Sequence, residues 1–278
     1  MNIISSKQSS SLWNHTELYV KRCSNTRSYR IYIAVPGTPP PLAGYPVIYL
    51  LDANSVFGTM TEAMRLQSRR PEVTGVQPSI IVGVGYPSAE PFPAERHYDF
   101  TKTTPDDELP PHPAGGQWPE QGGADDFLNF IEEELQPYIR KNYMIDGMQQ
   151  TIFGHSLGGL FVLHTLFNKP HLFSCYIAGS PSIHWNKHSL SASEQQLAKR
   201  IHQAPLLIRL LIAVGELEQS HKSGMFSNAK QLAARLEVQS EHGLHVKYKE
   251  FSGEGHISIL PALISRAIRF PSESTDFR

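Results

Sequence analysis

The pentapeptide Gly154-His155-Ser156-Leu157-Gly158 is the feature that most restricts how this chain can fold. An apolar run, Thr151–Phe153, comes directly before it, and the apolar segment Leu160–Leu163 follows it. This context predicts a sharp turn from a strand into a helix, because side chains at 154 and 158 would crowd a serine held in such a turn. The pattern therefore predicts that Ser156 projects as a nucleophile, the alternative being a chance match in a loop. His155 is interpreted as a packing or hydrogen-bonding residue of the strand.

Strand-like and helix-like segments alternate along the rest of the chain. The predicted strands are Glu17–Arg22, Tyr29–Val35, Val47–Leu51, Ile80–Val84, Thr151–Phe153, Cys175–Ala178, Leu206–Val214 and Val246–Phe251. Apolar residues recur at helical spacing over 127–139, 228–236 and 258–270. This order predicts an α/β-hydrolase fold, with a mostly parallel central sheet, helices on both faces and no separate large cap domain. The 278 residues are expected to form a single domain, 1–278.

A proline-rich excursion at about 86–123 interrupts this alternation. Its prolines lie at 87, 91, 93, 105, 110, 111, 113 and 119, so no helix is expected to persist there. Arg96, Tyr98, Phe100 and Trp118 favour an ordered connection that runs over a pocket near the active site.

A serine hydroxyl needs a base to accept its proton, and in this fold the base follows the last strand. His256 lies in that position, in a glycine-containing loop between Val246–Phe251 and the closing helix. The orienting carboxylate should follow the preceding strand, where Glu216 and Glu218 compete. Glu218 is favoured, because a residue further past the strand can fold back to the histidine, whereas Glu216 would serve a loop or cap. A site in which neither carboxylate orients His256 remains the third alternative.

Attack on an ester places negative charge on the carbonyl oxygen, which two backbone N–H groups should bind. One donor is expected at Leu157, directly after the nucleophile. The other should come from the loop after Val47–Leu51, at Asn54 with Ala53 as the alternative. Asp52 is then a candidate for holding a polar substrate group or the loop itself.

Charge and hydropathy argue against a nucleic-acid-binding protein and against a membrane-spanning one. The formal net charge of −1 gives no field that would attract nucleic acid or an anionic membrane surface. No apolar run approaches the roughly 20 residues that span a bilayer. Residues 1–11 are polar and serine-rich, unlike a secretory signal, so a cytoplasmic location is expected, although a trimmed periplasmic or secreted form would look the same.

No metal or cofactor is expected. Cys23 and Cys175 are far apart and belong to no metal-ligand spacing, so both are interpreted as buried free thiols. His184 and His188 have i,i+4 spacing, but no third ligand accompanies them.

Beyond the pentapeptide, several further segments occur together and in order: Tyr49–Asp52 with Asn54, Arg96–Thr101, Gly122–Phe127, Gly154–Gly159, Ser180–Asn186 and Gly253–His256. In these segments the chain resembles the siderophore esterases of the α/β-hydrolase superfamily, in the esterase D-like group, which open ferric enterobactin-type trilactones. The resemblance covers nearly the whole chain. It implies catalytic roles for Ser156 and His256, an arginine near the substrate at Arg96, and a pocket wall that contains Trp185. Some relatives lack an effective acid, which leaves Glu218 open.

The resemblance also implies that the chain hydrolyses the backbone ester of a catecholate siderophore through an acyl-enzyme. Arg96, Tyr98 and Trp185 would then form a polar and aromatic pocket, and the partner would be a small-molecule ester, including an iron–siderophore complex. Feruloyl, acetyl and other acyl esterases share these motifs, and an acyltransferase would differ only in its acceptor. A non-catalytic binding protein on the same scaffold is the alternative of another class. Nothing in the sequence indicates an oligomeric state.

Overall fold

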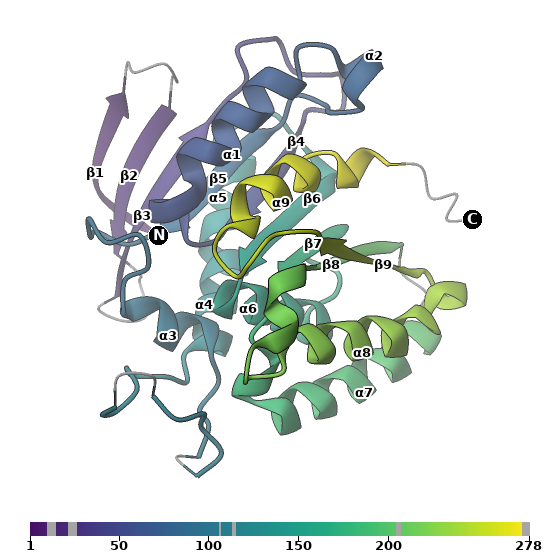
Figure 1. The fold of residues 1–278 in the computed structure, drawn as a ribbon. Helices are drawn as coiled ribbons and strands as arrows, with labels where there is room; N and C mark the ends of the chain where they lie inside the picture. Colours follow the sequence, from purple (N-terminus) through teal and green to yellow (C-terminus); the bar gives the residue numbers. More distant parts are fainter. Residues whose placement is uncertain (10–14, 22–26, 106, 113–114, 204–206, 274–278) are drawn as a thin grey trace. The chain divides into compact units, whose positions relative to one another are not determined.

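The computed structural model describes residues 1–9, 15–21, 27–105, 107–112, 115–203 and 207–273 (Figure 1). Within these ranges the strands form a nine-stranded sheet in the order β1-β2-β3-β5-β4-β6-β7-β8-β9. The chain divides into two compact units. The first comprises residues 1–93, 128–152 and 264–278, and the second comprises residues 94–127 and 153–263.

The first unit contains the strands that precede the nucleophile. They are β1 (Asn2–Ser9), β2 (His15–Lys21), β3 (Ser28–Ala34), β4 (Tyr45–Leu50) and β5 (Ile80–Gly85), with most of β6 (Ile145–His155). The pairs β1–β2, β2–β3 and β3–β5 are antiparallel, whereas β4 and β5 are parallel. Every residue of β5 is buried, as expected for a continuous apolar run in a central strand. The helices here are α1 (Ala53–Gln67), α2 (Pro71–Thr74), the π-helix η1 (Phe130–Leu135), α5 (Gln136–Asn142) and the 3₁₀ turn η5 (Phe270–Ser272).

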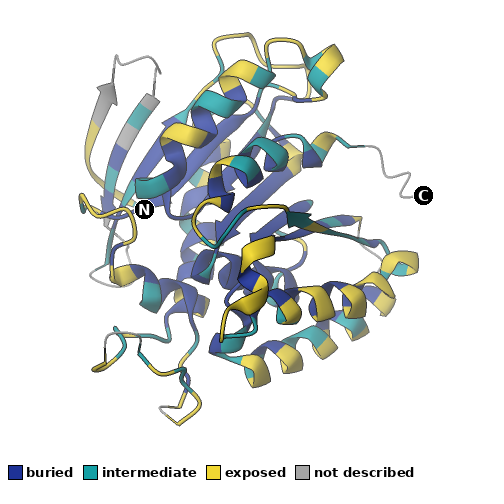
Figure 2. Ribbon diagram, viewed as in Figure 1, coloured by how far each residue is buried: buried dark blue, intermediate teal, exposed yellow. Residues whose placement is uncertain are grey.

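The second unit contains three parallel strands, β7 (Cys175–Gly179), β8 (Ile208–Gly215) and β9 (Leu244–Phe251). Its helices are α3 (Glu95–Phe100), α6 (Leu157–Asn168), α7 (Lys187–Gln203) and α8 (Met225–Glu237), with 3₁₀ turns η2 (Ile183–Trp185), η3 (Glu216–Ser220) and η4 (Ser240–His242). Helices α4 (Ala124–Asn129) and α9 (Ile259–Ala267) each include residues of both units. Figure 2 shows the buried central strands in dark blue and the exposed residues of α7 and α8 in yellow. Helix α6 is buried along nearly its whole length, which explains its largely apolar sequence.

The predicted alternation of strands and helices is confirmed, but several elements were missed or misjudged. Strand β1 lies in the serine-rich start of the chain, and α1 and α7 had not been predicted. Strand β6 begins at Ile145, ahead of its apolar run. The expectation that no helix persists in the excursion is wrong for α3, because residues 94–104 contain no proline and can close helical hydrogen bonds.

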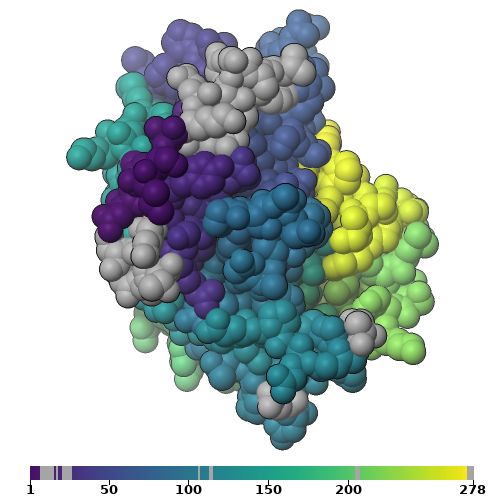
Figure 3. Space-filling model, turned by 90° about the vertical axis from the view of Figure 1, so that its left-hand side faces the viewer, coloured from purple at the N-terminus to yellow at the C-terminus, as the bar shows by residue number. Residues whose placement is uncertain are grey.

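Some predictions fall on residues that the structure does not describe. Arg22, Cys23, Pro113 and Leu206 lie outside the described ranges. Cys175 is a buried free thiol, as predicted. The excursion is visible in Figure 3, where its blue to teal residues occupy much of one face. No helix within the described residues is long and apolar enough to cross a membrane.

Candidate active site

Ser156 occupies the turn between β6 and α6. Its backbone has φ 59° and ψ −118°, an unfavourable conformation for a residue with a side chain. The turn is held by hydrogen bonds from the Ser156 N–H to the Gly179 carbonyl at 2.9 Å and from the Leu160 N–H to the Ser156 carbonyl at 3.0 Å. A Cβ atom at Gly154 would lie 2.3 Å from the Gly158 carbonyl oxygen, so position 154 admits only glycine. The local sequence therefore produces a strand–serine–helix turn in which Ser156 projects.

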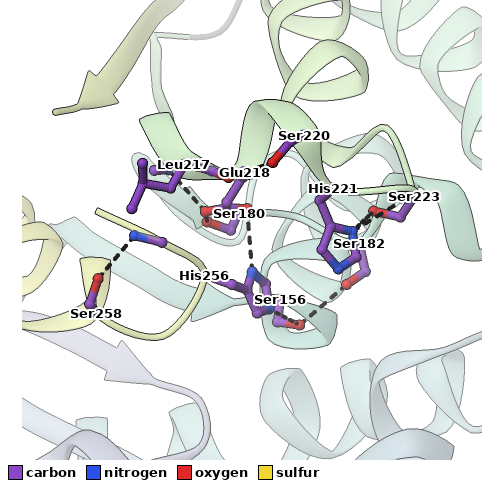
Figure 4. Close-up of polar contacts among 12 residues, drawn as sticks. Ser156, Ser180, Ser182, Leu217, Glu218, Ser220, His221, Ser223, His256 and Ser258 are labelled. Carbon is purple, nitrogen blue, oxygen red and sulfur yellow. Dashed lines mark hydrogen bonds and ion pairs between the residues drawn. The ribbon is translucent and has the colours of Figure 1, made fainter. Parts of the chain in front are cut away.

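A chain of hydrogen bonds connects Ser156, His256 and Glu218, which follow three different strands (Figure 4). The Ser156 Oγ lies 3.1 Å from the His256 Nε2. The His256 Nδ1 lies 3.3 Å from the Glu218 Oε2. With its proton on Nδ1, the imidazole donates to the carboxylate and accepts the hydroxyl proton at Nε2. This arrangement can activate a serine hydroxyl for attack.

Glu218 is buried in η3, with 2% of its surface exposed. Its Oε1 accepts hydrogen bonds from the Ser180 Oγ at 2.6 Å and from the Gly215 N–H at 2.9 Å. Burial alone would raise the pKa of Glu218, but the hydrogen bonds from His256, Ser180 and Gly215 outweigh burial and leave the pKa below its ordinary value. Glu218 is therefore ionised at neutral pH and can stabilise a protonated His256.

Glu216, the competing carboxylate, points to a different part of the chain. Its Oε2 accepts hydrogen bonds from the Ser252 Oγ at 2.6 Å and the Gly253 N–H at 2.8 Å. These bonds, with that from Ser252 the stronger influence, lower the pKa of Glu216. The side chain is exposed and connects η3 to the loop after β9. The structure thus brings Glu218, and not Glu216, to His256.

His155 packs beside the histidine of this chain. It is 3% exposed, and its ring centroid lies 4.6 Å from that of His256. Burial lowers the pKa of His155 well below its ordinary value, and the charges of His256 and Arg96 lower the pKa further. His155 is therefore a neutral ring packed against His256, which agrees with its interpretation as a packing residue.

Trp185 belongs to a cluster of aromatic rings in the second unit, here called the aromatic cluster: His97, His112, Trp118 and Trp185. The Trp118 ring centroid lies 4.7 Å from that of Trp185 and 4.6 Å from that of His112, and the His97 centroid lies 5.6 Å from those of both tryptophans. The Nε1 of Trp185 and the Nδ1 atoms of His97 and His112 are buried and make no hydrogen bond to the described residues. Burial, followed by the charges of Arg96 and His112, lowers the pKa of His97 to about 4.

The predicted site residues Arg96, Tyr98 and Leu157 lie outside the aromatic cluster. Arg96 is 6% exposed, and its guanidinium carbon lies 5.4 Å from the centroid of the Phe100 ring. The Tyr98 ring covers Gly123, where a Cβ atom would lie 2.0 Å from the Tyr98 Cε1. Leu157 is the first residue of α6.

Asp52 and Asn54 belong to the first unit, at the start of α1. Asp52 is buried in a left-handed conformation with φ 53°. The Asn54 side chain donates to the carbonyls of Tyr86 at 3.0 Å and Ser88 at 2.8 Å, and accepts from the Tyr86 N–H at 2.8 Å. Asn54 thereby connects α1 to the chain after β5.

Metal-binding groups do not assemble in the described part of the chain. No cluster of three or more His, Cys, Asp or Glu side chains there could hold an ion. His184 is partly buried, and burial, followed by the charges of His221, Lys187 and His256, lowers its pKa to about 4.

Two neighbours of the hydrogen-bonded chain were not identified from the sequence. Ser180 donates to Glu218, and the Ser182 Oγ lies 3.3 Å from the Ser156 Oγ. Both lie in the segment Ser180–Asn186, which contributed to the resemblance. Their hydroxyl groups alone carry no recognisable pattern, because serine is common in turns of every kind.

A mostly parallel sheet with helices and a serine at the strand–helix turn define the α/β-hydrolase class, so the predicted fold class is confirmed. Residues 24–258 match the Esterase family, described as "Putative esterase", and the chain belongs to that family. It is accordingly an esterase, a hydrolase that acts on carboxylic ester bonds.

The relatives agree with this assignment. The chain is 58% identical over 247 residues to the ferri-bacillibactin esterase BesA of Bacillus subtilis (strain 168), covering 89% of this chain and 86% of the relative. It is 33% identical to the siderophore enterobactin esterase of Emericella nidulans, covering 81% of each chain. The crystal structure of the BES protein from Bacillus cereus superposes with a TM-score of 0.87 at 43% identity, covering 96% of this chain and 99% of that one. The predicted resemblance to siderophore esterases is therefore confirmed.

Proposed function

We propose that this esterase hydrolyses the backbone ester bonds of a catecholate siderophore through an acyl-enzyme on Ser156. The observation that carries the proposal is the 58% identity, over 89% of the chain, to an enzyme named ferri-bacillibactin esterase. The hydrogen-bonded chain from Ser156 through His256 to Glu218 supplies the chemistry.

In the proposed reaction, the Ser156 Oγ attacks the ester carbonyl carbon while its proton passes to the His256 Nε2. Glu218 remains ionised and stabilises the imidazolium. The N–H groups of Leu157 and Asn54 are proposed to bind the negatively charged oxygen of the tetrahedral intermediate. His256 then protonates the leaving alcohol oxygen as the C–O bond breaks, which leaves the acyl-enzyme.

Deacylation repeats these steps with water as the nucleophile. His256 accepts a proton from the water molecule as it attacks the acyl carbonyl, and returns that proton to the Ser156 Oγ as the Ser156 ester breaks. The free carboxylic acid leaves. Each ester bond that is cut consumes one water, and no cofactor is required by the proposed steps.

The aromatic cluster supports an aromatic acyl group in the substrate. Trp185 is buried, but His97, His112 and Trp118 are partly exposed, and a flat catechol ring of the substrate is proposed to pack against these rings. The buried Trp185 N–H has no partner among the described residues, and such a donor is costly unless a ligand or water accepts its hydrogen bond. A catecholate or amide oxygen of the substrate would accept it. Arg96, Tyr98 and Asp52 are proposed as further substrate contacts, and Arg96 would favour a negatively charged substrate.

An iron–siderophore complex is the proposed physiological form of the substrate. Hydrolysis of its backbone esters would lower the affinity of the siderophore for iron after the complex enters the cell. The proposal therefore includes a cytoplasmic location. Fractionation of the source cells tests the location. A comparison of the ferric and iron-free trilactone tests the form.

The decisive experiment compares kcat/KM for a tris-catecholate trilactone, a feruloyl ester, an acetyl ester and a neutral aryl ester. We expect the trilactone to exceed the feruloyl and acetyl esters by roughly tenfold or more. Ser156→Ala and His256→Ala should each lower kcat by about 10³-fold or more, and the double variant should be little worse, because nucleophile and base act as one unit. A preference for the feruloyl ester would assign the aromatic cluster to a hydroxycinnamoyl group and refute the siderophore substrate. Product formed mainly with an added alcohol would indicate acyl transfer.

A further inference from the structure

The turn Ser180-Pro181-Ser182, which follows β7, contacts both ends of the proposed catalytic chain (Figure 4). At one end, the Ser180 Oγ donates to the Glu218 Oε1 at 2.6 Å. At the other end, the Ser182 Oγ lies 3.3 Å from the Ser156 Oγ, and the Ser182 N–H donates to the Ser156 carbonyl at 3.1 Å. Both serines are buried, with 0% and 4% of their surfaces exposed. Two hydroxyl groups buried in one turn thus bond to the acid and to the nucleophile.

The backbone holds this turn in a fixed position. Ser180 has φ 39°, in the left-handed region that L-residues rarely occupy. Its N–H donates to the Ala213 carbonyl at 2.6 Å, while the carbonyl of the preceding Gly179 accepts from the Ser156 N–H at 2.9 Å. Strained conformations of this kind persist where the surrounding structure imposes them, and they concentrate at functional sites.

Close packing beneath the turn adds a further constraint. A Cβ atom at Gly159 would lie 2.7 Å from the Gly179 carbonyl oxygen and 3.1 Å from the Pro181 Cα. Helix α6 can therefore approach the turn closely only because position 159 is glycine. The turn is held by the ends of β6 and β8 and by α6, which leaves little freedom for either serine side chain.

We propose that Ser180 and Ser182 are positioning residues of the esterase. Ser180 fixes the plane of the Glu218 carboxylate so that Oε2 faces the Nδ1 of His256. Ser182 donates to the Ser156 Oγ, which leaves the Ser156 proton directed at the Nε2 of His256. The inference rests on the proposed roles of Ser156, His256 and Glu218.

A purely structural role would have different consequences. Buried hydroxyl groups that only stabilise the turn would, when removed, reduce the amount of folded protein or its melting temperature. Each folded active site would then keep its kcat. A positioning role instead lowers kcat per active site with little change in KM, because substrate binding is untouched. It also makes the loss at Ser180 depend on Glu218, since residues that act through one another are not additive.

The test uses a neutral aryl ester, with active sites counted by a fluorophosphonate that labels the nucleophile. Ser180→Ala should lower kcat per labelled site by about tenfold or more and change KM by less than about twofold. Ser182→Ala should slow the second-order rate of fluorophosphonate labelling by about threefold to tenfold. The matched control is Ser227→Ala on α8, whose hydroxyl donates to the Gly224 carbonyl, and it should behave as wild type.

The double variant Ser180→Ala with Glu218→Gln should be no slower than Glu218→Gln alone. Losses that multiply, or an unchanged kcat per labelled site in Ser180→Ala, would overturn the proposal. If Ser180→Ala does not fold, Ser180→Gly removes the hydroxyl while relieving the left-handed strain. Normal turnover in that variant refutes the positioning role, and a loss of about tenfold supports it.

Failure of the proposed function gives a different result. Wild-type protein that turns over the aryl ester but not the trilactone contradicts only the siderophore substrate, and the positioning test then still applies. Wild-type protein that is not labelled at Ser156 removes the nucleophile assignment and the positioning proposal together.

Discussion

Replacing Glu218 by glutamine tests the carboxylate that the structure places beside His256. The substitution keeps the size of the side chain and removes its charge. In the structure, Oε1 accepts from two donors, the Ser180 Oγ at 2.6 Å and the Gly215 N–H at 2.9 Å, whereas Oε2 faces the His256 Nδ1 at 3.3 Å. The amide oxygen of the new side chain should therefore take the Oε1 position, which turns its NH₂ group toward Nδ1.

An NH₂ group facing Nδ1 favours the wrong tautomer of His256. Nδ1 would accept a hydrogen bond, the imidazole proton would move to Nε2, and Nε2 could no longer accept the proton of Ser156. A hydrogen bond to a charged group contributes about 1.5–3 kcal/mol, and each 1.36 kcal/mol of activation free energy is about tenfold in rate, so loss of this bond alone gives about 10–150-fold. The tautomer change adds to this loss, so we expect a decrease in kcat of about 100-fold or more.

The assay is turnover of a neutral aryl ester at pH 8, measured per active site, with the variant checked for folding by circular dichroism. Glu216→Gln is the matched control. It has the same chemistry two residues away, and its carboxylate binds Ser252 and Gly253, so its kcat should change by less than about twofold. Equal activity of both variants and wild type would refute the reasoning and indicate a serine–histidine pair that works without an acid.

Three further predictions concern the fold and the pocket. Gly154→Ala should lower the free energy of unfolding in urea by roughly 2–4 kcal/mol, since the new Cβ would overlap backbone atoms. Gly58→Ala in α1, where open space surrounds the position, should raise it by about 0.5–1 kcal/mol. Similar effects of the two substitutions would refute the steric argument. The His164 Nε2 lies 3.0 Å from the Asp125 Oδ1, and His164 is the largest influence that lowers the pKa of Asp125 from 3.8 to about 2, against the opposing effect of burial. The charge of Asp125 therefore contributes stability above pH 3.8 that is lost as the pH falls toward 2. Asp125→Asn should make the melting temperature depend less on pH between these two values. Arg96→Ala should lower kcat/KM for catecholate or anionic esters more than for neutral aryl esters, and an equal loss for all esters would instead indicate a structural role.

The turn at Ser156 was predictable from the sequence because its requirements are local. An apolar strand, two glycines and an apolar helix lie within about a dozen consecutive residues, and steric exclusion at 154 operates over the same short distance. The places of most strands along the chain were likewise predictable, because burial imposes an apolar pattern on each strand separately. His256 could be predicted as the base because it follows the last strand. Helix α3 was missed because the density of prolines was averaged over a stretch that contains a proline-free interval.

Only the tertiary structure could distinguish Glu218 from Glu216. The two carboxylates are separated by one residue, and which of them faces His256 depends on how the 3₁₀ turn after β8 lies against the loop after β9. The same holds for Ser180 and Ser182, whose hydroxyl groups meet partners 38 and 26 residues away. Contacts of this kind are set by the pairing of parallel strands, which aligns the ends of β7, β8 and β9 at one edge of the sheet. A sequence pattern indicates the burial of each strand, but not which side chains contact one another beyond the strand ends. At this site the hydrogen bonds between those side chains are what could activate the serine.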